Sequence, residues 1–314
     1  MTTELTTEKS VIEAPAPGIY YDIPAFQYFK WDAVNASFLK HMAKSASHAR
    51  FNADVHSEPT PAMLQGSVCH TQLFEPDQIA KRYVVAGECS GVTGKGAACT
   101  NQGKILSGGV WYCGVHGRGR SWDDLPVVAD EECSESPAII TQEMIKNAQA
   151  MAIRARWDNK IREILVGAKF EVCIVWIDPV TEILCKARLD VYRPDTCQIA
   201  DLKTCEDASE DGFSRTIGDL GYDIQAAFYL DAATSIAGEL HDDFIFIAQE
   251  KTPPYVAAAW RLHQDAIGLG RHRYRKLLAD YKWCRDNNLW PGYHDHQIAV
   301  INVTRYFFEK EKAK

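Results

Sequence analysis

Three β-rich runs follow one another in residues 171–204 with only short turns between them, and this arrangement limits the fold more than any other feature. The runs are EVCIVWI (171–177), EILCKARLDVY (182–192) and CQIADLKT (197–204), separated by DPVT and RPDT. Strand-like runs joined by turns this short pair as antiparallel neighbours. We therefore expect an antiparallel meander at the centre of the fold.

Helical patterns flank the meander on both sides. We expect helices in residues 24–50, 60–76, 142–166, 221–237 and 260–287, and one more strand in 244–250. Asn35 or Ser37 is a candidate cap in the first helical region, and Thr141 caps the third. Helices that alternate with a meander and a further strand indicate a mixed α/β fold.

The composition is typical of an ordinary globular protein. Of the 314 residues, 46% are hydrophobic and 24% are charged, and no apolar stretch is long enough to span a bilayer. Residues 1–18 lack a basic region followed by an apolar core, so they do not form a secretory signal, and we expect a disordered lead-in there. Residues 19–314 are expected to form one domain.

Charge and cysteine content narrow the function classes. Ten Cys residues without an export signal indicate reduced thiols, some of them metal ligands, rather than disulfides. The net charge of -8 at pH 7 argues mildly against nucleic-acid binding by bulk electrostatics. It does not exclude a nucleic-acid partner, because carboxylates that hold Mg²⁺ are negative and basic patches can be local.

The turns set the register of the meander. If the second turn is symmetric, Asp190 lies opposite Asp201, with the two side chains about 5 Å apart on one face. Strand alternation places Lys203 on the same face, two residues beyond Asp201. A first turn centred near 180–181 sets Glu171 opposite Asp190 in the same way. Three carboxylates and one lysine are then expected to form a row across one face of the sheet.

Opposed carboxylates in this row repel each other, so a sheet has no structural reason to place them there. A hard divalent cation supplies a reason, because Mg²⁺ prefers carboxylate oxygens and keeps several waters. Lys203 beside such a metal could orient or deprotonate an attacking water, or stabilise charge on a phosphate. The alternative is a hairpin of solvated charges in another register, since a slip of one residue moves every side chain to the other face.

A glycine-rich segment, residues 87–120, interrupts the helical patterns and holds a cluster of metal-binding residue types. These residues are Cys89, Cys99, Cys113 and His116. The last two have a chelating Cys-x-x-His spacing, and three Cys with one His suit a closed tetrahedral Zn²⁺ site. A segment without a hydrophobic core of its own would need such a bound metal in order to fold. We expect a zinc-binding insertion, in which Cys133 could replace one ligand; the alternative is a loop with scattered reduced thiols.

Short motifs in a fixed order resemble those of a known nuclease family. RLD, followed by a turn and DLKT, looks like the core of the PD-(D/E)XK nucleases. The next helix, GYDIQAAFYLDAA with Gln225 and Tyr229, resembles the Gln-x-x-x-Tyr motif of the RecB-like branch. Upstream, GSVCHTQLFEP resembles the Gly-x-x-x-His element of that branch, with Gly66 and His70. FIAQEKTPPY is similar to a segment of RecE-type exonucleases.

The resemblance implies a fold and a function. The fold is the α/β fold of the PD-(D/E)XK nucleases, a central mixed sheet with an antiparallel meander and flanking helices, here with the zinc-binding insertion. The function is that of a RecE-like phage or prophage exodeoxyribonuclease, which uses Mg²⁺ or Mn²⁺ to degrade double-stranded DNA from its ends in the 5′→3′ direction. It implies a ring-shaped homo-oligomer in the cytoplasm of a bacterial host or phage-infected cell, which exposes a 3′ single strand for a single-strand annealing recombinase.

Two other functions stay open. One is a single-strand or structure-specific RecB-like nuclease that keeps the chemistry and changes the substrate. The other is an inactive nuclease fold that serves as a zinc-containing module for binding DNA or protein. The intact Asp190, Asp201 and Lys203 argue against the inactive fold.

The resemblance also implies residue roles at the matching positions. Asp190 and Asp201 are implied metal ligands, together with the Leu202 carbonyl. Lys203 is the implied catalytic lysine. His70 is implied to be a further metal ligand that brings its helix to the site, although a histidine in an apolar helix is more often a satisfied core residue.

The remaining matching residues have less definite roles. Gln225 and Tyr229, one helical turn apart, would contact the DNA backbone or orient the site. They could instead be a helix face that packs on the sheet. Glu171 would bind a second metal or hydrogen-bond the ligands of the first.

Basic residues offer contacts for phosphates. Arg188, opposite Lys203 in the expected register, is a candidate phosphate contact, although it could instead pair with Glu171 or Asp201. Four cations surround an apolar stripe in the last helix: Arg271, Arg273, Arg275 and Lys276. They could follow DNA phosphates, or they could form an ordinary solvated helix face.

Overall fold

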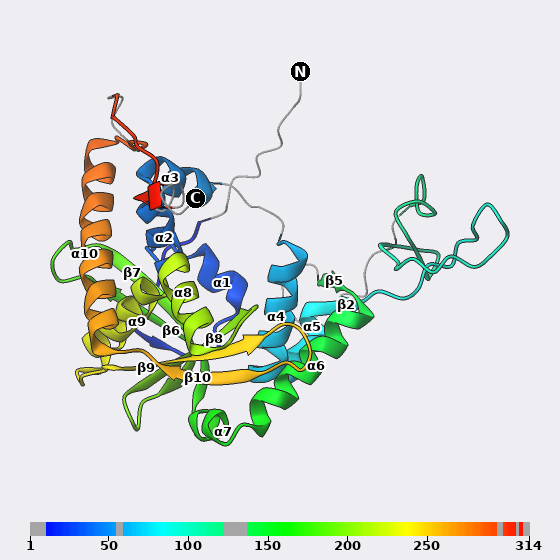
Figure 1. Cartoon of the computed structure of the whole chain (residues 1–314), viewed down its shortest axis with the longest axis horizontal. Helices are drawn as coiled ribbons and strands as arrows, with labels where there is room; N and C mark the ends of the chain where they lie inside the picture. The colour runs from blue at the N-terminus through cyan, green and yellow to red at the C-terminus, as the bar shows by residue number, and fades with distance from the viewer. Residues whose placement is uncertain are drawn as a thin grey trace.

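The computed structural model describes residues 11–54, 59–121, 123, 137–293, 298–305 and 308–309. It is an α/β fold built on a mixed sheet of six strands in the order β1-β6-β7-β8-β9-β10 (Figure 1). The strands are β1 (Gly18–Tyr20), β6 (Lys169–Ile177), β7 (Leu184–Arg193), β8 (Gln198–Cys205), β9 (Asp243–Glu250) and β10 (Ala257–Arg261). Neighbouring strands are antiparallel, apart from β8 and β9, which run parallel.

Helices cover both faces of the sheet. One apolar core lies between the sheet and α2 (Ala36–Lys44), α8 (Glu210–Leu220), α9 (Tyr222–Ala237) and α10 (Gln264–Asn287). A second core joins the opposite face to α4 (Pro61–Phe74), α6 (Gln142–Trp157) and α7 (Asn159–Leu165). The shorter helices are α1 (Ala25–Lys30), α3 (Ala46–Asp54), α5 (Ile79–Arg82) and a 3₁₀ turn (Pro76–Gln78). The sheet is therefore the middle of three layers.

The meander has the register that turn symmetry predicts. In β7 and β8, Val191 lies opposite Ala200. Asp190 and Asp201 are the next residues on the two strands, so the same register places them opposite each other. In β6 and β7, Phe170 pairs with Val191 and Val172 pairs with Leu189, so Glu171 and Asp190 lie opposite each other between these two pairs. The three carboxylate positions are therefore neighbours across adjacent strands, as expected.

Regular strand geometry breaks at the same place. Glu171 has a positive φ of 56°, in the left-handed region. On β7, Leu189 belongs to one core, whereas Val191, two residues further on, belongs to the other. The paired positions of β7 and β8 end at Val191 and Ala200. The sheet is therefore open beside Asp190, and residues from both helical layers can approach it.

Several expected elements have different bounds. The helix expected over 24–50 is three helices, α1 to α3, and Asn35 caps the second of them with its side chain. The helix expected over 142–166 is divided, because the Asp158 carboxylate accepts hydrogen bonds from the first backbone N–H groups of α7. The region expected as the start of the last helix contains strand β10, and α8 was not predicted.

The glycine-rich segment leaves the body between two short strands, β2 (Tyr83–Val85) and β5 (Ala138–Ile140), which pair in parallel. Figure 1 shows it projecting away from the helices and the main sheet. Within it, β3 (Ile105–Ser107) and β4 (Val110–Tyr112) form a small hairpin. Cys133, the alternative zinc ligand, lies outside the described residues.

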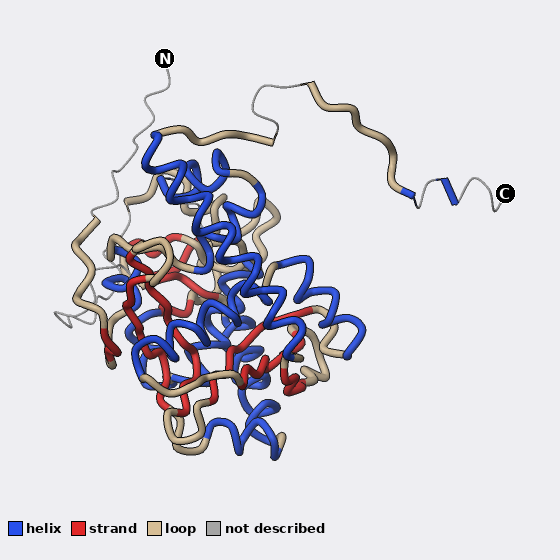
Figure 2. The backbone as a smooth tube through the Cα atoms, turned by 90° about the vertical axis from the view of Figure 1, so that its left-hand side faces the viewer, coloured by secondary structure: helices blue, strands red, loops and turns tan. Residues whose placement is uncertain are grey.

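The start of the described chain contacts the body, whereas its last segment leads away from it. Residues 1–10 of the expected lead-in lie outside the described part, and Ile12 pairs with Trp31 of the body. Residues 298–305 lead away from the body, as Figure 2 shows from the side. None of the helices in the described residues is long and apolar enough to cross a membrane.

Candidate active site and metal centres

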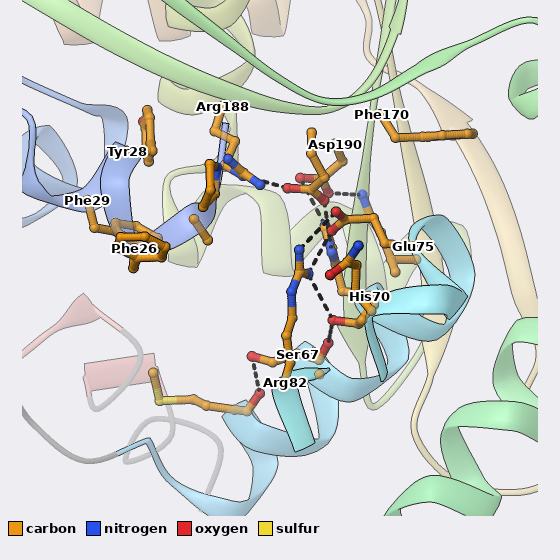
Figure 3. Close-up of a pocket in the computed structure, with 18 of the residues that line it drawn as sticks. Phe26, Tyr28, Phe29, Ser67, His70, Glu75, Arg82, Phe170, Arg188 and Asp190 are labelled. Atoms are coloured by element: carbon orange, nitrogen blue, oxygen red, sulfur yellow. Dashed lines mark hydrogen bonds and ion pairs between the residues drawn. The ribbon is translucent and has the colours of Figure 1, made fainter. Parts of the chain in front are cut away.

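A cavity of about 880 Å³ lies where the sheet is open beside Asp190 (Figure 3). Residues from α1, α4, α5 and strands β6 to β8 line it. The residues that the sequence analysis singled out are well represented among them: Gly66, His70, Glu171, Arg188, Asp190, Leu202, Lys203 and Tyr229. The volume is near the upper end of the range of about 300–1,000 Å³ for ligand pockets. The cavity can therefore hold a substrate as well as an ion.

His70 joins two carboxylates at the floor of the cavity. Its Nδ1 lies 3.1 Å from Glu171 Oε1, and its Nε2 lies 3.1 Å from Asp190 Oδ1. Burial acts to lower the pKa of His70, but the charges of Asp190 and Glu171 outweigh it and raise this pKa to about 9. Without a metal, the imidazole is therefore a cation at neutral pH, held between two anions.

Helix α4 brings His70 to the sheet. Thr60 caps the helix, because its side chain accepts a hydrogen bond from Met63 N. One turn before His70, a Cβ at Gly66 would lie 3.1 Å from Thr204 Oγ1 on β8. The glycine of the Gly-x-x-x-His element therefore permits the close approach of α4 that places the imidazole at the carboxylates.

Asp190 is fixed by the neighbouring strand. Its Oδ2 accepts a hydrogen bond of 2.8 Å from Leu202 N, where the backbone pairing of β7 and β8 stops. Burial acts to raise the pKa of Asp190, but His70 and Lys203 outweigh it, and this pKa lies below its usual value. Asp190 is therefore an anion with one oxygen held by the backbone and the other directed at His70.

Asp201 and Lys203 form a buried pair beside this floor. Lys203 Nζ lies 2.5 Å from Asp201 Oδ2, and Gln225 Nε2 donates a hydrogen bond of 2.7 Å to Asp201 Oδ1. Burial and the charge of Asp190 raise the pKa of Asp201 to about 6. Burial acts to lower the pKa of Lys203, but Asp201 and Asp190 outweigh it and raise this pKa. Lys203 Nζ also lies 4.8 Å from the centroid of the Tyr222 ring.

The carboxylates therefore form two groups instead of the single row that was expected. The ligand group, whose ligand atoms all lie within 4.8 Å of one another, consists of His70, Glu171 and Asp190. Asp201 lies outside it and faces Lys203. The expectation of one row was wrong because it assumed regular strands, whereas Glu171 has a left-handed backbone and the β7–β8 pairing ends before Asp201.

The donor atoms fit a hard divalent cation. Glu171 Oε1 and Asp201 Oδ2 are buried and accept no hydrogen bond of good geometry from the described residues, although each lies in an ion pair. Buried carboxylate oxygens with unused lone pairs are suited to Mg²⁺ or Mn²⁺, and an imidazole can complete such a set. The ligand group, with Asp201 beside it, could therefore hold one of these ions.

Arg188 and Tyr229 border the cavity in different ways. Arg188 Nε lies 2.6 Å from Glu171 Oε2, and its Nη1 donates a hydrogen bond of 2.7 Å to Ile23 O. This pairing with Glu171 is the structural alternative considered for Arg188. Tyr229 lines the cavity from α9, one turn from Gln225, so both lie on the helix face directed at the site.

The four cations of α10 lie in ion pairs and do not line the cavity. The pairs are Arg271–Asp231, Arg273–Asp223, Arg275–Asp231 and Lys276–Asp280. Asp223 and Asp231 belong to α9, so three of these pairs fasten α10 to α9. These contacts favour the structural interpretation of this helix face over a track for DNA phosphates.

Sequence patterns did not identify the walls of the cavity. On one wall, Arg82 forms a two-point ion pair with Glu75, with N–O distances of 2.7 and 2.9 Å. On another wall, Phe26 and Phe29 of α1 line the cavity. Glu75 lies in the quoted stretch GSVCHTQLFEP, five residues after its His, and the other three lie outside the motifs. Tyr222 could have been found, because it lies one helical turn before the Gln of the Gln-x-x-x-Tyr motif.

The predicted zinc ligands come together in the projecting segment. One ligand atom from each of the four lies within 4.8 Å of the others: Cys89, Cys99, Cys113 and His116. His116 Nδ1 lies 3.3 Å from Cys89 Sγ and 3.5 Å from Cys113 Sγ, while Cys99 Sγ lies 4.0 Å from Cys113 Sγ. Tetrahedral zinc would separate such atoms by roughly 3.5–3.8 Å. This buried Cys₃His group could therefore hold zinc.

Local backbone contacts support this group. Cys89 Sγ accepts hydrogen bonds from Cys113 N at 3.1 Å and Gly91 N at 3.3 Å. Burial acts to raise the pKa of Cys89, but these N–H groups outweigh it and lower this pKa, which favours the thiolate that binds zinc. A Cβ at Gly91 would lie 2.2 Å from His116 Nδ1, so only glycine leaves room for the imidazole.

Comparison with known proteins agrees with this architecture. The family model described as "PDDEXK-like domain of unknown function (DUF3799)" matches residues 35–302. No curated protein matches the sequence. Among solved structures, the crystal structure of a "putative exonuclease" from Eubacterium rectale is similar, with a TM-score of 0.54 and 14% sequence identity. The match covers 88% of this chain and 92% of that chain, and at this identity it concerns the fold.

Proposed function

The chain belongs to the family of PDDEXK-like domains of unknown function, and on this premise we propose that it is a Mg²⁺- or Mn²⁺-dependent exodeoxyribonuclease. The observation that carries the proposal is the cavity that combines the ligand group with Lys203. Carboxylates, an imidazole and a lysine around one substrate-sized space are groups suited to the metal-assisted hydrolysis of a phosphodiester.

Each side chain has a proposed role that follows from its contacts. The ligand group would hold the cation, which supplies Lewis-acid stabilisation of the charge that develops on the attacking water and on the phosphate. Lys203 donates a hydrogen bond to the phosphate or orients the water. Asp201, fixed by Gln225, holds the Lys203 ammonium at the edge of the cavity. Arg188 fixes Glu171, and Tyr229 contacts the DNA backbone.

The finer features of the proposal come from the resemblance to RecE-like phage and prophage enzymes. The substrate is the end of double-stranded DNA, which is degraded in the 5′→3′ direction. The product is a 3′ single strand for a single-strand annealing recombinase. Residues 19–314 form the nuclease domain of a ring-shaped homo-oligomer, and residues 87–120 form an insertion within it.

The insertion is proposed to be a structural zinc module. Its buried cluster consists of the three cysteines of the Cys₃His group, with the partly buried Tyr112 packed against them. A segment with so small a core depends on a metal for its fold. All four ligands come from the protein, which is typical of a closed structural site.

End-labelled linear duplex DNA tests the nuclease proposal. Wild-type protein is expected to release label with Mg²⁺ and not with EDTA, to release a 5′ label first, and to leave closed circular DNA intact. Lys203→Met is expected to lower the rate at least about 100-fold, because it removes a donor aimed at developing charge. Lys160→Met, whose side chain is 77% exposed on α7, is the matched control and should keep full activity. A wild-type protein without Mg²⁺-dependent hydrolysis would contradict the proposal.

A further inference from the structure

Three aromatic residues of α1 line the cavity without a part in the proposed chemistry: Phe26, Tyr28 and Phe29. Phe26 and Phe29 lie three residues apart, so they share one face of the helix. Phe29 is 54% exposed, whereas Tyr28 beside it is buried against the sheet. Figure 3 shows both Phe rings on the far side of the cavity from Arg82 and Ser67. The wall is therefore an apolar surface that faces a charged floor.

Two cations of β7 hold α1 in place at both ends. Lys186 Nζ donates to backbone oxygens at the end of the helix, including Trp31 O at 2.6 Å. Arg188 Nη1 donates to Ile23 O, just before the helix begins, at 2.7 Å. Lys186 and Arg188 lie four and two residues before Asp190 on the same strand. The strand that carries a proposed metal ligand therefore also fixes the position of the aromatic wall.

The charges around the cavity suit a phosphate at the floor. Four carboxylates and four Lys or Arg side chains line it, besides His70. Their formal charges balance, and Asp201, paired with Lys203 beside the floor, adds one negative charge. A divalent cation in the ligand group would therefore leave the cavity with a net positive charge. A nucleotide is complementary to this cavity, because its anionic phosphate suits the charged floor and its aromatic base suits the apolar wall. The phosphate would then lie at the metal on the floor, and the base would stack on the Phe rings of the wall.

We propose that Phe26 and Phe29 form a stacking platform for unpaired nucleobases of the strand that is cleaved. The inference rests on the proposed nuclease function and adds the state of the substrate, which is a strand end released from its base pairs. Bases within a duplex stack on their neighbours, so their faces are not available to a ring beside the helix. An unpaired base offers a free face, and stacking on it is tolerant of sequence.

The test is the binding of a short single-stranded DNA with 2-aminopurine near its 5′ end, with Ca²⁺ in place of Mg²⁺ to prevent hydrolysis. Stacking on an aromatic ring quenches 2-aminopurine fluorescence. Wild-type protein is expected to quench it, and Phe26→Ala/Phe29→Ala to lose the quenching and bind about 5- to 100-fold more weakly. Phe29→Trp should keep both properties. The matched control is Phe51→Ala, since Phe51 is 65% exposed on α3 and does not line the cavity.

The kinetics of hydrolysis with Mg²⁺ distinguish a role of the two Phe residues in substrate binding from a role in the chemical step. The double variant is expected to raise KM about 5- to 100-fold and to keep kcat at saturating substrate, because it removes uniform binding. Unchanged affinity and quenching in the double variant would overturn the platform. So would a change in oligomeric state, measured by light scattering, with unchanged DNA binding. Failure of the nuclease proposal is a different result, in which wild-type protein binds and quenches the DNA but does not hydrolyse it.

Discussion

The Asp190 carboxylate accepts a hydrogen bond of 2.8 Å from Leu202 N, at the point where the backbone pairing of β7 and β8 ends. One oxygen thus satisfies a backbone donor at an opening in the sheet, where an unpaired N–H would be unfavourable. The other oxygen lies 3.1 Å from His70 Nε2. The same side chain therefore stabilises the opened sheet and contributes to the proposed metal site.

This double role gives a prediction for Asp190→Asn. The amide keeps an oxygen for Leu202 N, so the fold should persist, but the variant loses a charged ligand. We expect Mn²⁺ to bind at least about 10- to 100-fold more weakly by calorimetry, and Mg²⁺-dependent hydrolysis to fall by at least as much. Asp195→Asn is the control, because Asp195 is 58% exposed in the β7–β8 turn and pairs only with Arg193 among the described residues. Wild-type metal affinity in Asp190→Asn would exclude Asp190 as a ligand.

The raised pKa of His70 predicts how stability depends on pH when no metal is bound. The folded protein holds the His70 proton up to about pH 9, whereas the unfolded chain releases it near 6.5. Between these values the folded state binds more protons, so the contribution of His70 to stability is complete below about 6.5 and is lost as pH rises through 9. In EDTA, the advantage of wild type over His70→Gln in free energy of unfolding should shrink by up to about 3 kcal/mol from pH 6 to 9.5. Denaturant titrations at both pH values measure it, and an advantage that grows with pH would contradict the assignment.

Local sequence features predicted the register of the site but not its opening. Short symmetric turns set which residues of β6, β7 and β8 are opposite one another, so Glu171, Asp190 and Asp201 could be placed from the turns alone. The left-handed backbone of Glu171 and the early end of the β7–β8 pairing are departures from regular strand geometry. The register was predicted from symmetric turns and strand alternation, which assume regular strands and therefore do not predict such departures.

The walls of the cavity escaped prediction for a related reason. Phe26 and Phe29 lie in a six-residue helix that is too short to show a clear period. Lys186 helps to hold α1 in place, and the sequence of its strand does not show that this lysine is buried beneath a helix. The approach of the four side chains of the Cys₃His group, in contrast, could be predicted because they lie within one short segment.

Removal of one thiolate tests the zinc module. Cys113→Ser is expected to reduce bound zinc from about one ion per chain to background by mass spectrometry under native conditions, because a closed site needs all four ligands. The melting temperature of the body should change little, since the segment joins the body between β2 and β5. Cys197→Ser is the control, as Cys197 is a free cysteine outside the Cys₃His group. Full zinc content in Cys113→Ser would exclude this ligand set.

Two glycines of α10 provide a matched test of how closely α10 packs on α9. A Cβ at Gly270 would lie 2.0 Å from Asp223 O and 2.4 Å from Asp223 C on α9, and backbone atoms cannot move aside without shifting the helix. Gly270→Ala is therefore expected to lower the free energy of unfolding by at least about 2 kcal/mol. Gly268, two residues away in the same helix, is exposed and would place its Cβ in open space, so Gly268→Ala should raise it by about 0.5–1 kcal/mol. Urea titrations of both variants measure the difference, and equal effects at the two positions would show that the helices are not in close contact at Gly270.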